Sequence, residues 1–503
     1  MNESTLSISR ACVLAVLACF LALPVAAVAA GGPATPDNDV QRVIVQALKP
    51  SPLENNLQHL TDRIGGRVPG TPAMQKAVAW AQQAFRAPGG ENVHAEPFQI
   101  PRSWAEGRTS FSIAAPLQLK LHAVSVAWTL PLAALHHAQI VDVNKGTAED
   151  FGRAGDLAGR IVLVHGKVIQ TWDDLNEEYD RVPPIIRRAL AGKAAAIAWI
   201  AERDRDLLYR HTDTQTGELE PIAQVIVARE EGLRLARLIA SGQQIYADLE
   251  IPNHVGGPLT TANVVAEIRG SEHPEQFVIL GAHLDSWELG TGALDNGCNS
   301  AMVIDALRAI RAAGVQPRRS IRFVLFSGEE EGLLGSEAYA RKHGAELDNA
   351  LAAVVFDSGS GRVTGFTLSG RTELAGAASE LMAPLNSMGV TQVTQDADMG
   401  TDNFDFVLQG VPTLVANQDP ANYMRNYHAM SDTFDKVDLG NLRQEVAEAA
   451  AVVVGIANAP QRFGTRQNRA QITQLLRATG LERTMKLNGV WGAWQSGQRG
   501  RKP

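Results

Sequence analysis

Short apolar runs alternate with helix-like stretches through the second half of the chain. Four of the runs are rich in β-branched and large apolar residues, which is typical of buried strands. They span residues 261–268, 277–280, 320–326 and 351–356. Apolar residues also recur at helical spacing over 302–310 and stop near Gly314, so we expect a helix there. Strands that alternate with helices in this way predict an α/β fold.

Histidines and acidic residues lie just after these predicted strands or in polar loops beyond them. They are His283, Asp285, Asp295, Glu329, Glu330, Asp357 and His428. In an open α/β sheet, ligands bind in the crevice at the carboxyl ends of the strands, so residues in these places can converge on one site. A histidine at a strand end can also be a core residue, and an Asp before a helix often caps it.

The residue types in this set are those that bind zinc. Zinc is bound by imidazole nitrogen and carboxylate oxygen, and a catalytic site leaves one position open for water. Two zinc ions roughly 3.5 to 4 Å apart need a carboxylate that bridges them, and each ion needs ligands of its own. Two histidines and three carboxylates meet that requirement: His283, His428, Asp295, Glu330 and Asp357. Glu329 is then a further carboxylate beside a ligand, as a general base requires.

Four motifs carry a resemblance to a known family. They are HLDSWELGTGALDN at 283–296, FSGEEEGLLGS at 326–336, FDSG at 356–359 and GTDNFDFVLQGVP at 400–412. By their order and spacing the chain resembles the zinc-dependent exopeptidase family of bacterial leucyl aminopeptidases and glutamate carboxypeptidase II. Within that family it most resembles plasma glutamate carboxypeptidase, or carboxypeptidase Q. The resemblance extends from about Leu53 to about Pro460.

The resemblance implies which residue holds which ion. His283 and Asp357 would be the terminal ligands of one zinc ion, and Glu330 and His428 those of the other. Asp295 would bridge the two, so the cofactors implied are two Zn2+ ions per chain.

The same resemblance implies roles for further carboxylates. Glu329 would be the catalytic base. Asp285 would be the carboxylate that orients His283. Asp402, in the last of the four motifs, could contact a ligand or the substrate, or could bond only to its own backbone, as an Asp in a turn often does.

The resemblance also implies a fold and an activity. The fold is a mixed, mostly parallel sheet with helices on both faces, and the activity is hydrolysis of dipeptides or short peptides that have a free amino terminus. Three alternatives stay open: an aminopeptidase that acts on longer peptides, a single-zinc acyltransferase similar to glutaminyl cyclase, and an inactive binding module of the same fold. A homodimer is also left open.

The pattern and the resemblance divide the chain into five parts. They are a signal peptide at 1–30, a linker at 31–52, a zinc peptidase domain at 53–108 and 257–460, an insert at 109–256 and a basic tail at 461–503. The tail ends in a glycine-rich stretch, which predicts partial disorder.

The insert resembles a protease-associated domain. Its predicted strands are at 159–165, 194–200, 224–227 and 245–249, and its predicted helix is at 230–239. Because the insert carries no cluster of ligand residues, we expect it to cover or shape the cleft.

The N-terminus and the net charge bear on location and partners. Arg10 precedes an apolar run at 11–23, as in a secretory signal peptide, although a membrane anchor or a lipoprotein signal are alternatives. Cleavage would leave Cys298 as the one cysteine, which excludes an intramolecular disulfide. A net charge of -8 argues against nucleic acid as a partner. We therefore expect a secreted or periplasmic protein that acts on peptides, without stable membrane association.

Overall fold

The computed structural model describes residues 36–502. The predicted signal peptide at 1–30 lies outside the described residues. Among the helices that are described, none is both long enough and apolar enough to cross a membrane. The strands of this part of the chain form two eight-stranded sheets and one two-stranded ladder.

The main sheet contains the four strands predicted in the second half of the chain. Its order is β1 (Glu91–Ile100), β12 (Leu259–Ile268), β14 (Arg319–Phe326), β13 (His273–His283), β15 (Ala350–Val355), β18 (Thr413–Gln418), β16 (Val363–Thr367) and β17 (Gln392–Thr394). The neighbours β14, β13, β15 and β18 run parallel, as do β16 and β17, and the other neighbouring pairs are antiparallel. The predicted mixed, mostly parallel sheet is confirmed.

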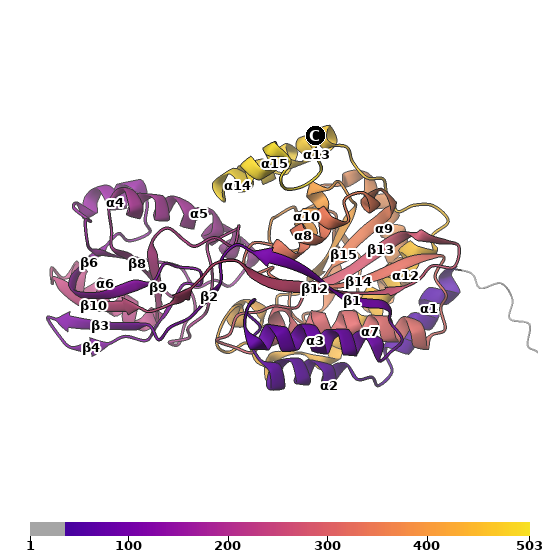
Figure 1. Cartoon of the computed structure of the whole chain (residues 1–503), viewed down its shortest axis with the longest axis horizontal. Helices are drawn as coiled ribbons and strands as arrows, with labels where there is room; N and C mark the ends of the chain where they lie inside the picture. The colour runs from indigo at the N-terminus through magenta and orange to yellow at the C-terminus, as the bar shows by residue number, and fades with distance from the viewer. Residues whose placement is uncertain (1–35, 503) are drawn as a thin grey trace, which may run out of the picture. The chain divides into compact units, whose positions relative to one another are not determined.

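Helices cover both faces of the main sheet (Figure 1). On one face lie α1 (Pro36–Ala47), α2 (Leu53–Gln58), α3 (Pro72–Arg86), α7 (Cys298–Ala312) and α12 (Leu439–Asn458), and on the other lie α8 (Leu334–Lys342) and α10 (Asn403–Leu408). Side chains of β13 alternate between the two faces: Val278 and Leu280 pack into the core with α7, whereas Phe277 and Ile279 pack with Tyr339. This alternation is that of a strand buried on both faces.

The interval 31–52, predicted as a linker, differs in the structure because it contains α1. Val43 and Ala47 are fully buried in the core of the main sheet, against α12 and α7. The apolar residues Val40, Val43, Ile44 and Ala47 recur at the spacing of an amphipathic helix. The apolar spacing gives this segment a face to bury, and it therefore forms a helix despite the glycines and prolines that precede it.

The insert forms the second eight-stranded sheet. Its order is β4 (Leu119–Lys120), β3 (Ser110–Ala115), β10 (Ile245–Ile251), β6 (Leu132–Asp142), β7 (Ile161–Val164), β8 (Ala196–Ile200), β9 (Ala223–Val227) and β5 (Ala123–Ser125). The predicted strands correspond to β7, β8, β9 and β10, and the predicted helix to α6 (Arg229–Ala240). A short ladder of β2 (Trp104–Ala105) and β11 (His254–Val255) joins the two ends of the insert. The likeness to a protease-associated domain stays a prediction.

Two helices of the insert, α4 (Ala148–Ala154) and α5 (Trp172–Ala191), are not evident from the sequence pattern. Pro183 and Pro184 lie inside α5, and prolines normally break a helix, which hides it. A capping box between Thr171 and Asp174 satisfies its first backbone N–H groups. The buried side of α5, including Ile185, packs on the face of the insert sheet opposite α6.

The C-terminal tail is folded, in contrast to the predicted partial disorder. It forms α13 (Arg469–Ala478), α14 (Leu481–Leu487) and α15 (Trp491–Ser496). Leu476 and Trp494 are buried against Phe404 and Leu408 of α10. The basic and glycine-rich composition predicted disorder, but apolar residues at helical spacing give these helices a face to bury.

Arg499 fixes the end of the tail to the peptidase core. Its guanidinium donates from Nε to Asp405 Oδ1 at 2.9 Å and from Nη2 to Asp405 Oδ2 at 2.7 Å. Both residues are buried, so this ion pair is shielded from water. A third bond reaches the carbonyl oxygen of Gly332, in the turn that follows Glu329 to Glu331.

We expect Arg499→Ala to lower the free energy of unfolding by about 3–5 kcal/mol, because it leaves the carboxylate of Asp405 buried without its partner. Urea unfolding measures this change. Arg483→Ala is the control, since Arg483 pairs with Asp180 at the surface and such pairs contribute about 1 kcal/mol or less. Equal effects of the two substitutions would contradict a stabilising role for the tail.

Candidate metal centre

The predicted metal ligands meet at the carboxyl ends of the central strands of the main sheet. His283 is the last residue of β13, Glu330 lies in the turn after β14, and Asp357 lies just after β15. Asp295 comes from the segment before α7, and His428 comes from the loop after α11 (Tyr423–Asn426). The structure therefore brings all five together, as expected of a crevice at the strand ends.

Asp295 lies between the two histidines, with one oxygen directed to each. Its Oδ1 is 3.1 Å from His283 Nε2, and its Oδ2 is 3.2 Å from His428 Nε2. Each histidine has a second carboxylate beside the same nitrogen: Asp357 Oδ1 is 3.0 Å from His283, and Glu330 Oε2 is 2.9 Å from His428. The five side chains thus form two similar halves that share Asp295.

The oxygens in this cluster are suited to a cation. Asp295 Oδ2 and Glu330 Oε1 are buried and have no hydrogen-bond partner among the described residues. Atoms that could bind a metal, one each from His283, Glu329 and Asp357, lie within 4.8 Å of one another. The same is true of His283, Asp295 and Glu330. Buried polar atoms without partners are costly, and a divalent ion satisfies several of them at once. Nitrogen and oxygen donors of this kind fit zinc and related divalent metals.

The crowding of carboxylates shifts the pKa values of the cluster. Burial raises the pKa of Glu330 to about 7 and that of Glu329 well above its usual range. Burial lowers the pKa of His428, but Glu330 and Asp295 outweigh this effect and raise it to about 9. The cluster without metal therefore holds protons at neutral pH, and a bound cation would displace them.

Glu329 and Asp285 flank the proposed ligands. Glu329 lies near His283 and Asp357, where a carboxylate that is not itself a ligand can exchange a proton with water. The side chain of Asp285 is 3.7 Å from His283 Nδ1, whereas its backbone carbonyl oxygen is closer, at 3.1 Å. Its Oδ2 accepts a hydrogen bond from the backbone N–H of Glu330 at 3.3 Å. In this structure the carbonyl, rather than the carboxylate, is the nearer partner of His283.

Asp402 lies at the start of α10 and is fully buried. Neither of its carboxylate oxygens has a hydrogen-bond partner among the described residues. Burial raises the pKa of Asp402 well above its usual range. It is therefore not a turn residue that bonds its own backbone, and its role as a contact of a ligand or substrate stays a prediction.

Asp432 lies beside the cluster, and the sequence analysis did not single it out. Its Oδ1 accepts from the backbone N–H of Leu294 at 2.6 Å, and its Oδ2 accepts from that of Asp295 at 3.1 Å. Burial raises the pKa of this carboxyl to about 7. Asp432 holds the backbone from which Asp295 projects, and its place four residues after His428 is the one signal for it in the sequence.

Arg67 anchors the same loop from the other side. Its fully buried guanidinium donates to the carbonyl oxygens of Leu284 at 2.6 Å, Thr291 at 2.8 Å, Gly292 at 2.8 Å and Gly65 at 3.0 Å. Burial lowers the pKa of Arg67 to about 10, so the side chain is still charged at neutral pH. The turn that contains Arg67 has a structural role beneath the metal centre.

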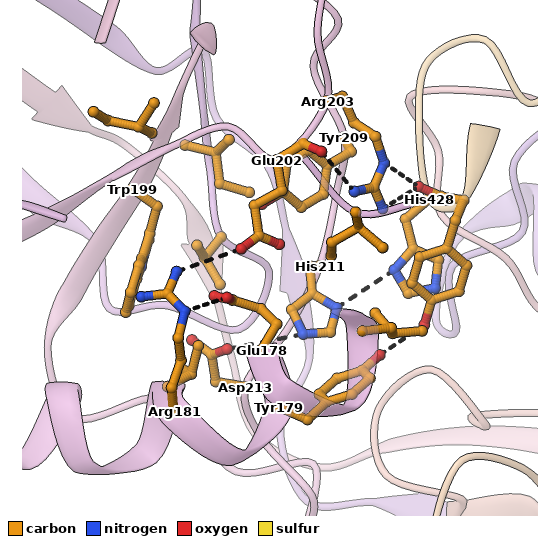
Figure 2. Close-up of a pocket in the computed structure, with 17 residues that line it drawn as sticks. Glu178, Tyr179, Arg181, Trp199, Glu202, Arg203, Tyr209, His211, Asp213 and His428 are labelled. Atoms are coloured by element: carbon orange, nitrogen blue, oxygen red, sulfur yellow. Dashed lines mark hydrogen bonds and ion pairs between the residues drawn. The ribbon is translucent and has the colours of Figure 1, made fainter. Parts of the chain in front are cut away.

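The insert also contacts the metal centre, although it carries none of the predicted ligands. His211 points toward His428 from the insert, as Figure 2 shows, and their Nδ1 atoms are 3.4 Å apart. Both residues border a pocket that is otherwise lined largely by α5 and the insert sheet. Burial lowers the pKa of His211 well below its usual value.

Comparisons with known proteins point to one peptidase family. Residues 263–454 match the family model described as Peptidase family M28. The chain is 28% identical over 408 residues to carboxypeptidase Q of Bos taurus, covering 79% of this chain and 84% of that protein. It is 27% identical over 431 residues to carboxypeptidase Q of Homo sapiens, covering 84% and 89%.

Solved structures give the same result for the fold. A peptidase M28 precursor from Shewanella amazonensis is similar with a TM-score of 0.78 and 26% identity, covering 86% of this chain and 99% of that one. A zinc aminopeptidase from Bacillus subtilis is similar with a TM-score of 0.63 and 19% identity, covering 83% and 97%. The resemblance to this exopeptidase family is thereby confirmed, and residues 263–454 are the part of the chain that matches the family model.

We expect Arg67→Lys to destabilise the fold, because one ammonium group cannot reach all the carbonyls that the planar guanidinium binds. Each carbonyl left without a donor costs about 1–3 kcal/mol of unfolding free energy. Urea unfolding measures the loss, and Arg63→Lys, at an exposed position four residues away, is the matched control. Equal unfolding midpoints for the two variants would contradict the anchoring role.

Proposed function

We propose that this chain is a dinuclear zinc exopeptidase that hydrolyses dipeptides or short peptides with a free amino terminus. The observation that carries the proposal is the position of Asp295, whose two oxygens face two different histidines at 3.1 and 3.2 Å. A carboxylate in that position suits a bridge between two metal ions. The family match and the likeness to carboxypeptidase Q support the same reaction class.

Five ligand side chains favour two ions over one. A single catalytic zinc needs three protein ligands and an open position. His283, Asp295 and Asp357 alone would supply that set, which leaves Glu330 and His428 without a purpose in a single-zinc acyltransferase. An inactive binding module would need neither these two residues nor the spare carboxylate of Glu329. The hydrolase is therefore favoured over both alternatives.

The chemistry follows from the residues around the ligands. Bound zinc would supply Lewis acidity toward the scissile carbonyl and toward the attacking water. The carboxylate of Glu329 accepts the proton of that water and returns it to the leaving amine. Glu329 lies beside His283 and Asp357 but is not one of the five proposed ligands, so its carboxylate is free to act on that water.

A small pocket beside the ligands supports a short substrate. It is bordered by Asp295, Glu330, His428, Trp287 and Asp432, among others. Three of the five proposed ligands lie in its wall, so a terminal group of a peptide in this pocket would lie against the metal centre.

The proposed roles of the carboxylates predict different outcomes for two substitutions. Glu329→Gln keeps the size of the side chain and removes its basicity, so zinc content should stay near that of the parent while the rate falls by roughly 10²- to 10⁴-fold. Asp295→Ala should lose zinc and activity together, and thermal stability should fall because bound metal stabilises only the folded state. Elemental analysis, peptidase rates and thermal unfolding provide the three measurements.

Glu54→Gln, at an exposed position of α2, is the matched control and should behave as the parent does. Loss of zinc in Glu329→Gln, or parent-like activity in that variant, would show that Glu329 is not the base. Zinc content of the parent also separates the alternatives, since about two ions per chain favour the hydrolase, about one the acyltransferase and none the binding module.

A substrate panel tests the second half of the proposal. We expect dipeptides to be cleaved faster than long peptides, and N-acetylated dipeptides to be resistant, because acetylation removes the amino-terminal charge. Aminoacyl amides provide a comparison without a second residue. Faster cleavage of long peptides would favour the aminopeptidase alternative, and cleavage of acetylated dipeptides would contradict the requirement for a free amino terminus.

A further inference from the structure

The backbone of the insert runs alongside the metal ligand His428. The N–H of Arg210 donates to the carbonyl oxygen of His428 at 2.9 Å, and the N–H of Met430 donates to that of Leu208 at 3.0 Å. These two bonds make a short antiparallel bridge around Ala429. The insert therefore fixes the chain on both sides of a proposed ligand.

Side chains of the insert hold the residue that precedes His428. The hydroxyl groups of Tyr179 and Tyr427 lie 2.6 Å apart, and Arg203 donates from Nη2 to the carbonyl oxygen of Tyr427 at 3.0 Å (Figure 2). On the other side, Ala429 is buried in the core of the insert, beneath α5. The loop of the peptidase core is thus packed into the insert.

The backbone of His428 needs such support. Its φ is +58°, in the left-handed region that residues with a side chain rarely adopt. Strain of this kind costs on the order of 1–3 kcal/mol and persists only where the surroundings determine the conformation. The hydrogen bonds from Arg210 and Arg203 are contacts of that kind.

The imidazole of His428 has its two nitrogens in different environments. Nε2 faces Asp295 and Glu330, and Nδ1 faces His211 Nδ1 at 3.4 Å, the long end of the hydrogen-bond range. The two rings are inclined by only 24°, with centroids 5.5 Å apart, so their planes are nearly parallel. The far nitrogen of His211, Nε2, is 3.9 Å from Asp213 Oδ1. A histidine that binds metal usually donates its other N–H to a partner that fixes the ring.

We propose that the insert is part of the metal centre, and that His211 is a positioning residue that accepts the Nδ1–H of His428. This inference rests on the proposed metal site and adds to it. Neutral imidazole can accept at one nitrogen while it donates at the other, so His211 can accept from His428 and direct its Nε2–H to Asp213. His211 orients the imidazole, and the backbone bridge at 208–210 places it.

The test compares two substitutions of His211 by metal affinity. His211→Leu removes the acceptor, whereas His211→Asn keeps an oxygen near the position of Nδ1. We expect His211→Leu to weaken the binding of one of the two zinc ions by roughly 10- to 100-fold, as loss of a partner of a metal-bound histidine does, and to leave the other ion near the parent value. Competition with a chelator gives the two affinities, and His211→Asn should lie closer to the parent.

The absorption spectrum of the cobalt-substituted enzyme gives a second measurement, because it reports the geometry around the ion independently of activity. His165→Leu is the matched control: His165 is another insert histidine that pairs with a carboxylate, Asp142 at 3.0 Å, and it does not border the metal centre. This control should keep the affinities and the cobalt spectrum of the parent.

The outcomes separate the inference from the function on which it rests. A parent that binds no metal would overturn the proposed function. The role of His211 would be overturned if the parent binds two ions and His211→Leu binds both with the affinities of the parent. It would also be overturned if His211→Leu and His211→Asn lose zinc affinity equally. If His211→Leu does not fold, Tyr179→Phe provides the test, because it removes one neutral hydrogen bond to Tyr427. It should weaken the binding of the zinc ion held by His428 by about fivefold. Unchanged affinity there would overturn the inference too.

Discussion

The burial of several carboxylates around Asp295 is the constraint on which the rest of the site depends. Donor atoms of His283, Glu330 and Asp295 lie within 4.8 Å of one another, and bulk water is largely excluded. Burial disfavours the charged forms of Glu330 and Glu329, and neighbouring carboxylates add to this effect, so the pKa values of both are raised. Without metal, bound protons offset part of the negative charge. A divalent cation offsets the same charges more completely. The crowding that opposes folding without metal therefore favours metal binding.

Such a site requires that its ligands cannot relax apart, and one loop shows how this is achieved. Arg67 donates to the carbonyl oxygens of Thr291 and Gly292, and Asp432 accepts from the backbone N–H of Asp295. A buried guanidinium thus binds acceptors of the loop, and a buried carboxyl group binds its donors. Each side chain lies in the field of the other, although burial outweighs the effect of Arg67 and raises the pKa of Asp432 to about 7. The proposed bridging ligand, Asp295, is thus held through its backbone as well as through its side chain.

The parts that could be predicted from the sequence are those with local patterns. Strands such as β13 have continuous apolar runs, and ligands such as His283 follow directly at their ends. The contacts of Arg67 could not be predicted, because it binds Leu284, which is 217 positions away. Helix α5 was hidden by its internal prolines, and the order of the tail depends on packing against α10. A local sequence pattern predicts which residues of a segment are buried. It does not predict which other segment they pack against, because that depends on the fold of the whole chain.

The insert is better described as a fixed wall of the site than as a lid. Arg210 is fully buried, and its Nη2 lies 2.7 Å from Glu288 Oε1, in the loop that leads to Asp295. The next residue, His211, reaches His428, so adjacent residues of the insert contact both the loop before Asp295 and the proposed ligand His428. A rigid movement of the insert that is large enough to admit a peptide would separate the buried guanidinium of Arg210 from Glu288. The same movement would pull His211 away from His428. A peptide is therefore expected to reach the proposed metal centre without a large movement of the insert.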